Sequence, residues 1–305
     1  MTYRHQRATA GLGALLQHWR RVRNVSQLAL AHEASVSPRH VCFVETGRSQ
    51  PSRDMVLLLA DALRIPFRER NALLLAAGYA PMFQESSLDA RELAPVRAAV
   101  DAILRQQAPY PAVVMNRHWD ILTANDAATR FFTRLLDGRT PPDAGNVLRL
   151  MFHPDGVRPC VENWETVAPT LLQRVHREAV GGALDDRGHA LLKEVLAYPG
   201  VPASWSAPDL GAPLLPVLPV TFALDGQRYN YFSAVTILGT PQDITLQEIR
   251  IECFFPLDDM TTAAARRLQE SISPPERSRA AGEPDVSRAM QRAGVRSRPV
   301  KRTAG

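Results

Sequence analysis

The feature that most constrains how this chain can fold is a pair of short helical patterns within residues 24–47. A serine stands before each pattern, Ser26 before the first and Ser37 before the second. A serine at that position can accept a hydrogen bond from a free backbone N–H of the first helical turn. Pro38 follows at the first position of the second helix, where its missing N–H costs nothing. Gly47 then suits the left-handed conformation that ends many helices. The sequence therefore predicts two short helices joined by a tight turn.

The second of these helices offers hydrogen-bond donors opposite its apolar residues. Val41 and Val44 lie three residues apart and are expected to face a core. This leaves Arg39, His40 and Phe43 on the outer side of the helix. Two helices that cross at a short turn, with donors on the second, form the helix-turn-helix arrangement that enters the major groove of DNA.

The whole pattern resembles the Cro/repressor (XRE-type) helix-turn-helix family. The residues that carry the resemblance are Ser26-Gln27, Leu30-Ala31, Val36-Ser37, Val41, Val44-Glu45, Gly47-Arg48 and Pro51-Ser52. The continuation, PRHVCFVETGRSQPSRDMV and then RERNALLLAAGYAP, is similar to the MmyB-like transcription regulators, and this likeness extends to about residue 265. Two positions depart from the usual pattern: Ser35 stands where the turn commonly carries Gly, and Cys42 stands where Ser is common.

The resemblance implies a partner, a double-stranded DNA operator, and a recognition helix at residues 37–45. An arginine on such a helix can bond a guanine edge twice, which gives about 1–3 kcal/mol of discrimination between bases. For each side chain taken singly, a solvated helix face is the alternative. The residues that the resemblance places against the duplex are Gln27, Ser37, Arg39, His40, Phe43, Arg48 and Arg53.

Charge is unevenly distributed along the 305 residues, whose formal net charge is +5. Residues 1–80 carry 11 Arg and 5 acidic residues, net +6, whereas residues 81–270 carry 17 basic and 23 acidic residues, net −6. Residues 271–305 carry 8 basic and 3 acidic residues, net +5. This division fits a nucleic-acid-binding N-terminal domain and a middle domain with another partner. The basic tail could add affinity for phosphates or act only as a solubilising end.

Cysteine and histidine spacing gives no support for a metal site, a disulfide framework or catalysis. Cys42, Cys160 and Cys253 lie far apart and form no CxxC pair, which favours a reducing cytoplasm. The eight histidines form no HxxH or HxxxH pair. No apolar run approaches the ~20 residues of a membrane span, and the phosphate-loop and GxSxG patterns are missing. We therefore predict a cytoplasmic protein that is not an enzyme, needs no cofactor and does not enter a membrane.

Beyond residue 80 the pattern changes from helical to mixed. Short apolar runs predict strands at 112–115 and 121–124, followed by a helix with Asp126 as its cap. A hairpin followed by a helix resembles the start of a PAS-type sensor fold. Residues 146–197 are helical in pattern, and Asp225-Gly226 is a strong hairpin-turn signal. Further strands are predicted at 214–224, where prolines favour a sheet edge, at 229–238 and at 246–254.

These patterns predict a multidomain protein. It has an all-α five-helix helix-turn-helix domain at residues 10–80, a linker at 81–90, an α+β PAS-like domain at 91–265 and a disordered basic tail at 271–305.

The likeness to MmyB-like regulators implies a pocket in the C-terminal domain for a small apolar or fatty-acyl ligand. An acyl chain needs an apolar tube, and its carboxylate needs an arginine or an amide. The alternative for each residue is an ordinary core aromatic, a surface arginine or a helix-capping asparagine. The candidates for the tube are Phe131, Phe132, Phe152, Trp164 and Phe232, and those for the head group are Asn125, Arg149, Asn163 and Arg174.

The sequence as a whole predicts a one-component DNA-binding regulator that works as a homodimer, because two half-sites multiply the affinity of one weak module. Two alternatives remain open. In the first, the C-terminal domain serves only for dimerisation or for binding a protein. In the second, the whole chain is an enzyme with a fused regulatory head.

Overall fold

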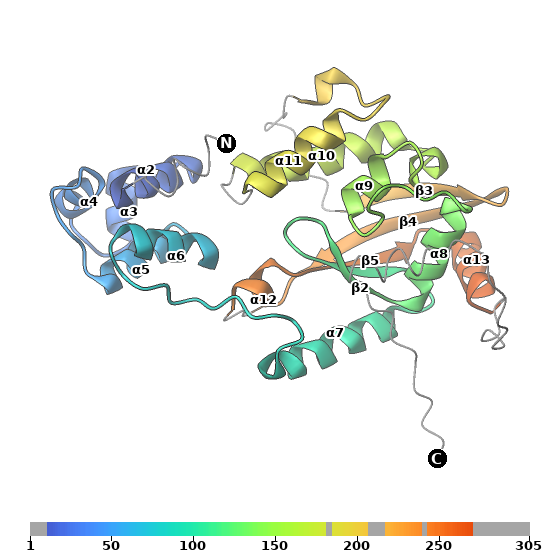
Figure 1. Ribbon diagram of the computed structural model, residues 1–305, viewed down its shortest axis with the longest axis horizontal. Helices are drawn as coiled ribbons and strands as arrows, with labels where there is room; N and C mark the ends of the chain where they lie inside the picture. The colour runs from blue at the N-terminus through green and yellow to red at the C-terminus, as the bar shows by residue number, and fades with distance from the viewer. Residues whose placement is uncertain (1–10, 181–184, 207–216, 240–242, 271–305) are drawn as a thin grey trace, which may run out of the picture. The chain divides into compact units, whose positions relative to one another are not determined.

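The computed structural model in Figure 1 describes residues 11–180, 185–206, 217–239 and 243–270. The predicted disordered tail at 271–305 lies outside these residues. The chain divides into two compact units. The first comprises Met1–Ser87, Val175–Leu191 and Gly239–Gln247, and the second comprises Leu88–Arg174, Leu192–Leu238 and Glu248–Gly305.

The N-terminal part of the first unit is all helical, as predicted. Between residues 11 and 78 the chain forms α2 (Leu12–Val22), α3 (Gln27–Glu33), α4 (Pro38–Glu45), α5 (Arg53–Ala62) and α6 (Phe67–Ala76). Helices α3 and α4 are the two predicted helices of the helix-turn-helix.

Local capping explains where these helices begin and end. The hydroxyls of Ser26, Ser37 and Ser52 accept backbone N–H groups at 3.0, 3.2 and 3.3 Å, so the predicted N-caps Ser26 and Ser37 are confirmed and Ser52 caps α5 in the same way. Gly47 follows α4 and has φ of +73°, the left-handed conformation in which glycine commonly ends a helix. Ser35, in the turn between α3 and α4, has φ of +52°. A residue with a side chain there is strained by about 1 kcal/mol relative to glycine.

The core of this helical part collects apolar side chains from all five helices. Burial of each such side chain contributes about 1.5–3 kcal/mol, so the helices are held mainly by packing. The side chains exposed by 1% or less include Leu16, Trp19, Leu30, Val41, Val44, Leu59, Leu73 and Leu74.

The start of the predicted linker packs against α6. The Asn71 side chain accepts the backbone N–H groups of Met82 and Phe83 at 2.9 and 3.0 Å and donates to the Phe83 carbonyl at 2.7 Å. The rings of Phe67 and Phe83 stack with their centroids 4.2 Å apart. Residues 82 and 83 are therefore held on the helical unit.

The second unit combines one antiparallel sheet with helices. Three short 3-10 turns lie at Arg91–Leu93, Arg158–Cys160 and Ala203–Ser206. The helices beyond residue 90 are α7 (Ala94–Gln107), α8 (Asp126–Leu136), α9 (Val147–Phe152), α10 (Trp164–Val180), α11 (Asp186–Leu196), α12 (Ile244–Glu248) and α13 (Asp259–Glu270). Parts of α10 and α11 and most of α12 belong to the first unit. The strands are β1 (Ala112–Met115), β2 (Ile121–Ala124), β3 (Leu218–Leu224), β4 (Gln227–Thr236) and β5 (Arg250–Pro256).

The five strands lie in the order β2-β1-β5-β4-β3, so the last strand in sequence is the central one. Strands β3 and β4 form the hairpin predicted around Asp225-Gly226, both of which have positive φ. Strand β3 carries Pro219 and lies at the sheet edge, as its proline predicted. Figure 1 shows α9 and α10 on one side of the sheet and α7 along the other.

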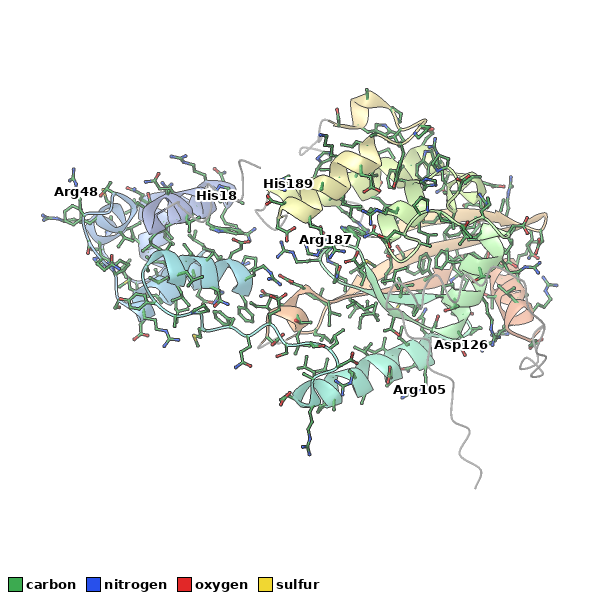
Figure 2. The ribbon with its side chains drawn as sticks, in the orientation of Figure 1. His18, Arg48, Arg105, Asp126, Arg187 and His189 are labelled. Carbon is green, nitrogen blue, oxygen red and sulfur yellow. The ribbon has the colours of Figure 1, made fainter. Side chains whose placement is uncertain are left out.

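Three details differ from the sequence prediction. Asn125, not Asp126, caps α8, and Asp126 is the first helical residue (Figure 2). The strand predicted at 246–254 begins only at Arg250, because residues 244–248 form the short helix α12. Helix α13 has a polar, alanine-rich sequence that was not predicted to be helical. Within the described residues, no helix is both long and apolar enough to cross a membrane.

Candidate DNA-binding and ligand-binding sites

Helix α4 has a buried side and an exposed start. Val41 and Val44 are exposed by 0% and 1%, whereas Ser37 and Arg39 are exposed. Arg48 follows the helix and is also exposed (Figure 2). Its backbone N–H donates to the Phe43 carbonyl at 2.8 Å, which closes the chain over the helix end. The cationic side chains of Arg39 and Arg48 are therefore accessible from solvent.

Two side chains of α4 are more constrained than the sequence indicated. The Arg39 guanidinium carbon lies 5.1 Å from the centre of the Phe43 ring, a cation–π contact that orients the arginine. His40 is half-buried, and its Nε2 atom is enclosed without a hydrogen-bond partner among the described residues. In this conformation the His40 ring does not offer Nε2 to a duplex.

A buried ion pair fixes the end of α4. Glu45 accepts two hydrogen bonds from the Arg20 guanidinium at 2.7 and 3.1 Å and a third from the Gln27 amide at 2.7 Å. The Glu45 side chain is only 1% exposed. The hydrogen bond to Glu45 is the largest cause that raises the pKa of Arg20. These contacts tie α2, α3 and α4 together.

This network changes the role of Gln27. Its side-chain nitrogen donates to Glu45, so its backbone N–H is the remaining donor to consider for a phosphate contact. That N–H has no intrahelical partner because it lies in the first turn of α3. Arg53, at the first position of α5, is exposed.

The second unit contains an apolar pocket between the sheet and helices α8, α9 and α10. Its empty space is about 510 Å³, which includes the part open to solvent at its mouth. The lining residues are Val113, Ile121, Phe132, Val147, Leu150, Met151, Val167, Leu171, Leu218, Val220, Phe222, Ser233, Glu252 and Phe254. A mainly apolar lining with a few polar groups is typical of small-molecule sites.

Two polar side chains line this pocket, Glu252 on the central strand β5 and Ser233 on β4. They are exposed by 6% and 2%. Burial is the largest effect on Glu252 and raises the pKa of its carboxyl group, whereas Ser233, Arg174 and Arg250 lower it. Neither residue was among the predicted site residues. The signal in the sequence was an acid inside the apolar run Ile251–Phe255.

Both predicted asparagines hydrogen-bond to the backbone through their side chains. The Asn125 oxygen accepts the N–H groups of Ala112 and Ala128, and its nitrogen donates to two carbonyls. Asn163 donates to the Pro219 carbonyl and accepts the Thr221 N–H, both at 2.9 Å, which fixes it to the edge strand β3. These hydrogen bonds leave Asn125 little capacity for a head group, whereas Asn163 keeps part of its capacity.

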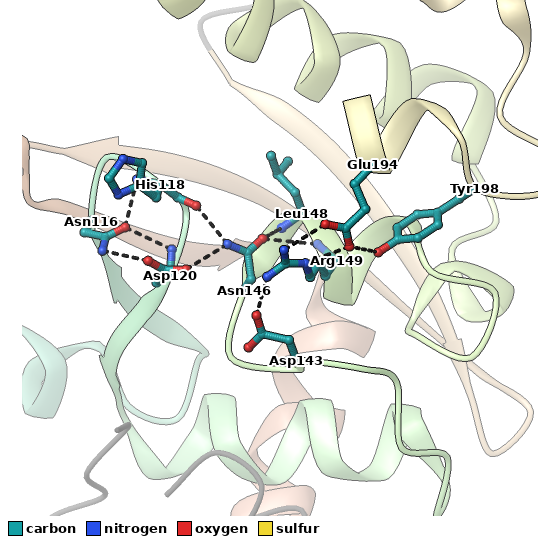
Figure 3. Close-up of polar contacts among 9 residues, drawn as sticks. All are labelled: Asn116, His118, Asp120, Asp143, Asn146, Leu148, Arg149, Glu194 and Tyr198. Atoms are coloured by element: carbon teal, nitrogen blue, oxygen red, sulfur yellow. Dashed lines mark hydrogen bonds and ion pairs between the residues drawn. The ribbon is translucent and has the colours of Figure 1, made fainter. Parts of the chain in front are cut away.

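Arg149 belongs to a polar network on the solvent side of α9 (Figure 3). Its guanidinium binds both oxygens of Glu194 at 2.8 Å and also pairs with Asp143. The hydrogen bond from Arg149 is the largest cause that lowers the pKa of Glu194. Burial and the hydrogen bond to Glu194 raise the pKa of Tyr198 to about 12. Arg149 therefore connects α9 to α11 and is already paired.

Asn146 extends the network to the β1–β2 turn. Its side-chain nitrogen donates to the His118 carbonyl and to Asp120 at 2.8 and 3.0 Å, and its oxygen caps α9. The helix that covers the pocket through Leu150 and Met151 is thus held at its start by Asn146 and on its outer side by Arg149.

Of the five predicted aromatics, Phe132 lines the pocket. Phe131 packs edge-to-face against Phe222 and Tyr231 instead. Phe152 packs against Trp164 with ring centroids 5.0 Å apart. Phe232 stacks on Phe255, and the alternation of the strand places both on the sheet face opposite Ser233 and Glu252. Arg174 is half-buried and acts on Glu252 without lining the pocket.

These two sites define a class of protein, a transcription regulator with a DNA-binding part and a ligand-binding part. Residues 11–73 match the family described as the helix-turn-helix domain. Residues 96–268 match the MmyB-like transcription regulator ligand binding domain. This second match covers more than half of the chain, and the chain belongs to that family. No match to the chain was found among curated proteins.

Proposed function

We propose that the chain is a one-component regulator that reads operator DNA with the helix at residues 37–45 and responds to a small apolar or acyl ligand in the pocket. The observation that supports the DNA part is the division of α4 between buried valines and an exposed start. Because Val41 and Val44 are fixed in the core, Arg39 remains free to reach base edges in a major groove.

The other predicted residues position the helix on the duplex. The exposed cations Arg48 and Arg53 are placed to bind phosphates, and the first-turn N–H of Gln27 offers a further phosphate contact. Ser37 lies at the start of α4, and the Phe43 ring orients Arg39 through their cation–π contact. His40 contributes only if its ring turns outward.

The test begins with an operator selected by the wild-type chain from random duplexes. Arg39→Ala should lose about 10- to 100-fold in affinity for the operator, corresponding to about 1–3 kcal/mol, with a much smaller loss on unrelated DNA. Arg266→Ala removes the same charge from an exposed position in α13 and serves as the matched control. An equal loss on operator and unrelated DNA would assign Arg39 to a phosphate instead.

Arg48→Ala should behave differently. A lost phosphate contact weakens all sequences alike and lowers the slope of log affinity against log salt by about 1. Fluorescence anisotropy at several salt concentrations measures this slope. A selective loss on the operator alone would contradict the phosphate assignment.

The pocket is proposed as the site of the controlling ligand. Native mass spectrometry of the purified chain should show a small bound molecule, or uptake of an added apolar one. Val147→Trp is expected to abolish this binding, because Val147 is half-buried at the pocket and a larger ring would fill it. Glu165→Gln, an exposed change on α10, is the control. An empty pocket after incubation with ligands would favour a C-terminal domain that only dimerises or binds a protein.

Regulation requires that the ligand bind the operator-competent and incompetent states with different affinity. We propose that the functional form is a homodimer on two half-sites. Sedimentation of the chain with and without operator measures this state. A monomer at saturation on the operator would contradict the dimer.

A further inference from the structure

Within the described part of the chain, the residues that line the pocket offer hydrogen-bond acceptors and no positive charge. Among the described lining residues, Ser233 and Glu252 carry the polar side-chain atoms, and the remainder are apolar. Glu252 lies on the central strand, with Val113 of β1 and Val235 of β4 as its partners across the sheet. The alternation of the strands places Ser233 on the same sheet face.

One of these two groups, the Ser233 hydroxyl, is incompletely satisfied by the described residues. The Ser233 hydroxyl is buried and makes no hydrogen bond of normal geometry with the described residues. It lies near enough to Glu252 to lower the pKa of that carboxyl group, yet burial outweighs this effect and the pKa is raised. Buried polar groups normally have a partner, so this corner of the pocket is suited to receive one.

The nearby cations do not supply that partner. Arg174 and Arg250 act on Glu252 through their charge, but neither lines the pocket. Arg250 lies over the Trp119 ring, with its guanidinium carbon 5.4 Å from the ring centre. The other candidates for binding a carboxylate head are occupied elsewhere, Arg149 by Glu194 and Asp143.

We propose that the ligand is an apolar molecule with a hydrogen-bond-donating head, a hydroxyl or an amine, which binds Glu252 and Ser233 while its chain lies against the valines and leucines of the pocket. A carboxylate head binds poorly, because it brings a second acid against Glu252 in an apolar enclosure, where one of the two must be protonated. This inference rests on the proposed role of the pocket and specifies the chemistry of its ligand.

The test compares eight-carbon probes that differ only in the head group. Octan-1-ol, octylamine, octanoate and methyl octanoate are titrated into the full wild-type chain, and binding is measured by calorimetry. We expect octan-1-ol and octylamine to bind at least about tenfold more tightly than octanoate or the ester, since one hydrogen bond to a buried charged group is worth about that factor. This comparison needs no variant.

Glu252→Gln then identifies the residue responsible. An amide cannot pair with an ammonium group as a carboxylate does, so octylamine should lose about tenfold or more while octanoate gains. Glu165→Gln, exposed and outside the pocket, should leave the order of the probes unchanged.

The outcomes separate this inference from the proposed function. Octanoate binding as tightly as octan-1-ol in the wild type, with both abolished by Val147→Trp, would overturn the donor head but keep the pocket. Absence of binding by every probe would overturn the pocket itself, and this proposal with it.

Discussion

Each of the two parts of the molecule contains a buried glutamate, and the surroundings of the two carboxyl groups differ. In the helical part, Glu45 accepts three hydrogen bonds from Arg20 and Gln27. In the α+β part, Glu252 lines a pocket, and the Ser233 hydroxyl beside it makes no hydrogen bond of normal geometry with the described residues. Both carboxyl groups are removed from water, but Glu45 is enclosed by donors from its own chain, whereas Glu252 borders a pocket.

This difference separates a structural acid from one available to a ligand. Glu45 fixes the angle between the helices of the helix-turn-helix, so its hydrogen bonds need to be complete before DNA arrives. Glu252 lines the pocket, so its carboxyl group is accessible to a ligand that binds there. A buried acid whose burial outweighs its favourable neighbours weakens a fold, and its presence next to a cavity therefore indicates a role outside stability.

The comparison is tested most strongly by making the same change at both positions. Glu45→Gln should lower the free energy of unfolding of the helical part by at least about 2 kcal/mol, because it leaves the nearly buried Arg20 without its counter-charge. Glu252→Gln should leave stability within about 0.5 kcal/mol of the wild type or raise it, since it removes a buried ionisable group. Urea unfolding gives the total, and hydrogen exchange resolved to α2, α4 and β5 assigns the loss. Equal losses would show that Glu252 is structural too.

The pH dependence of stability sharpens the same contrast within the second unit. Burial raises the folded pKa of Glu252 above the ordinary value of 4.5, so above that pH the folded state holds more protons than the unfolded state. Stability then falls as pH rises from 4.5 through the folded pKa, and Glu252→Gln should abolish this fall. The free energy of unfolding of Glu252→Gln should therefore exceed that of the wild type by a growing amount as pH increases across that window.

Glu194 should show the reverse slope. Arg149 lowers its folded pKa below 4.5, so the unfolded state binds more protons and stability is lost as pH falls through the folded pKa. The effect is small because both side chains are partly exposed. Urea midpoints of Glu194→Gln and Glu252→Gln measured between pH 3 and 8 test both signs, and parallel curves for the two variants would contradict the assignment.

The two parts also differ in how much of their structure can be predicted from the sequence. The helical part was predicted closely because its signals are local: Ser26, Ser37 and Ser52 act within three residues of themselves. Its buried network was not predicted, since Arg20 and Glu45 are 25 residues apart and meet only through the tertiary fold.

In the second unit, the strands and hairpin were predicted from alternation and turn residues, but the pocket residues largely were not. Arginine suits carboxylates, so the sequence suggests Arg149 as a head-group ligand, whereas in the structure it pairs with Glu194, 45 residues further on. Glu252 was overlooked although it interrupts an apolar strand. Which face of a strand is covered depends on helices far away in the sequence, so Phe232 could not be excluded from the pocket by local reasoning.

The smallest expected change in stability concerns two serines, one with a complete hydrogen bond and one without. Ser26 caps α3 with a hydrogen bond of 3.0 Å to the Ala29 N–H, whereas the buried Ser233 hydroxyl makes none of normal geometry. Ser26→Ala should therefore lower the free energy of unfolding by about 1 kcal/mol. Ser233→Ala should change it by less than about 0.5 kcal/mol, or raise it, because no complete hydrogen bond is lost and an unsatisfied buried group is removed. Urea unfolding at neutral pH measures both. A loss of about 1 kcal/mol for Ser233→Ala would mean that the hydroxyl already has a partner in the ligand-free protein, and the pocket would then have one polar group fewer to offer a ligand.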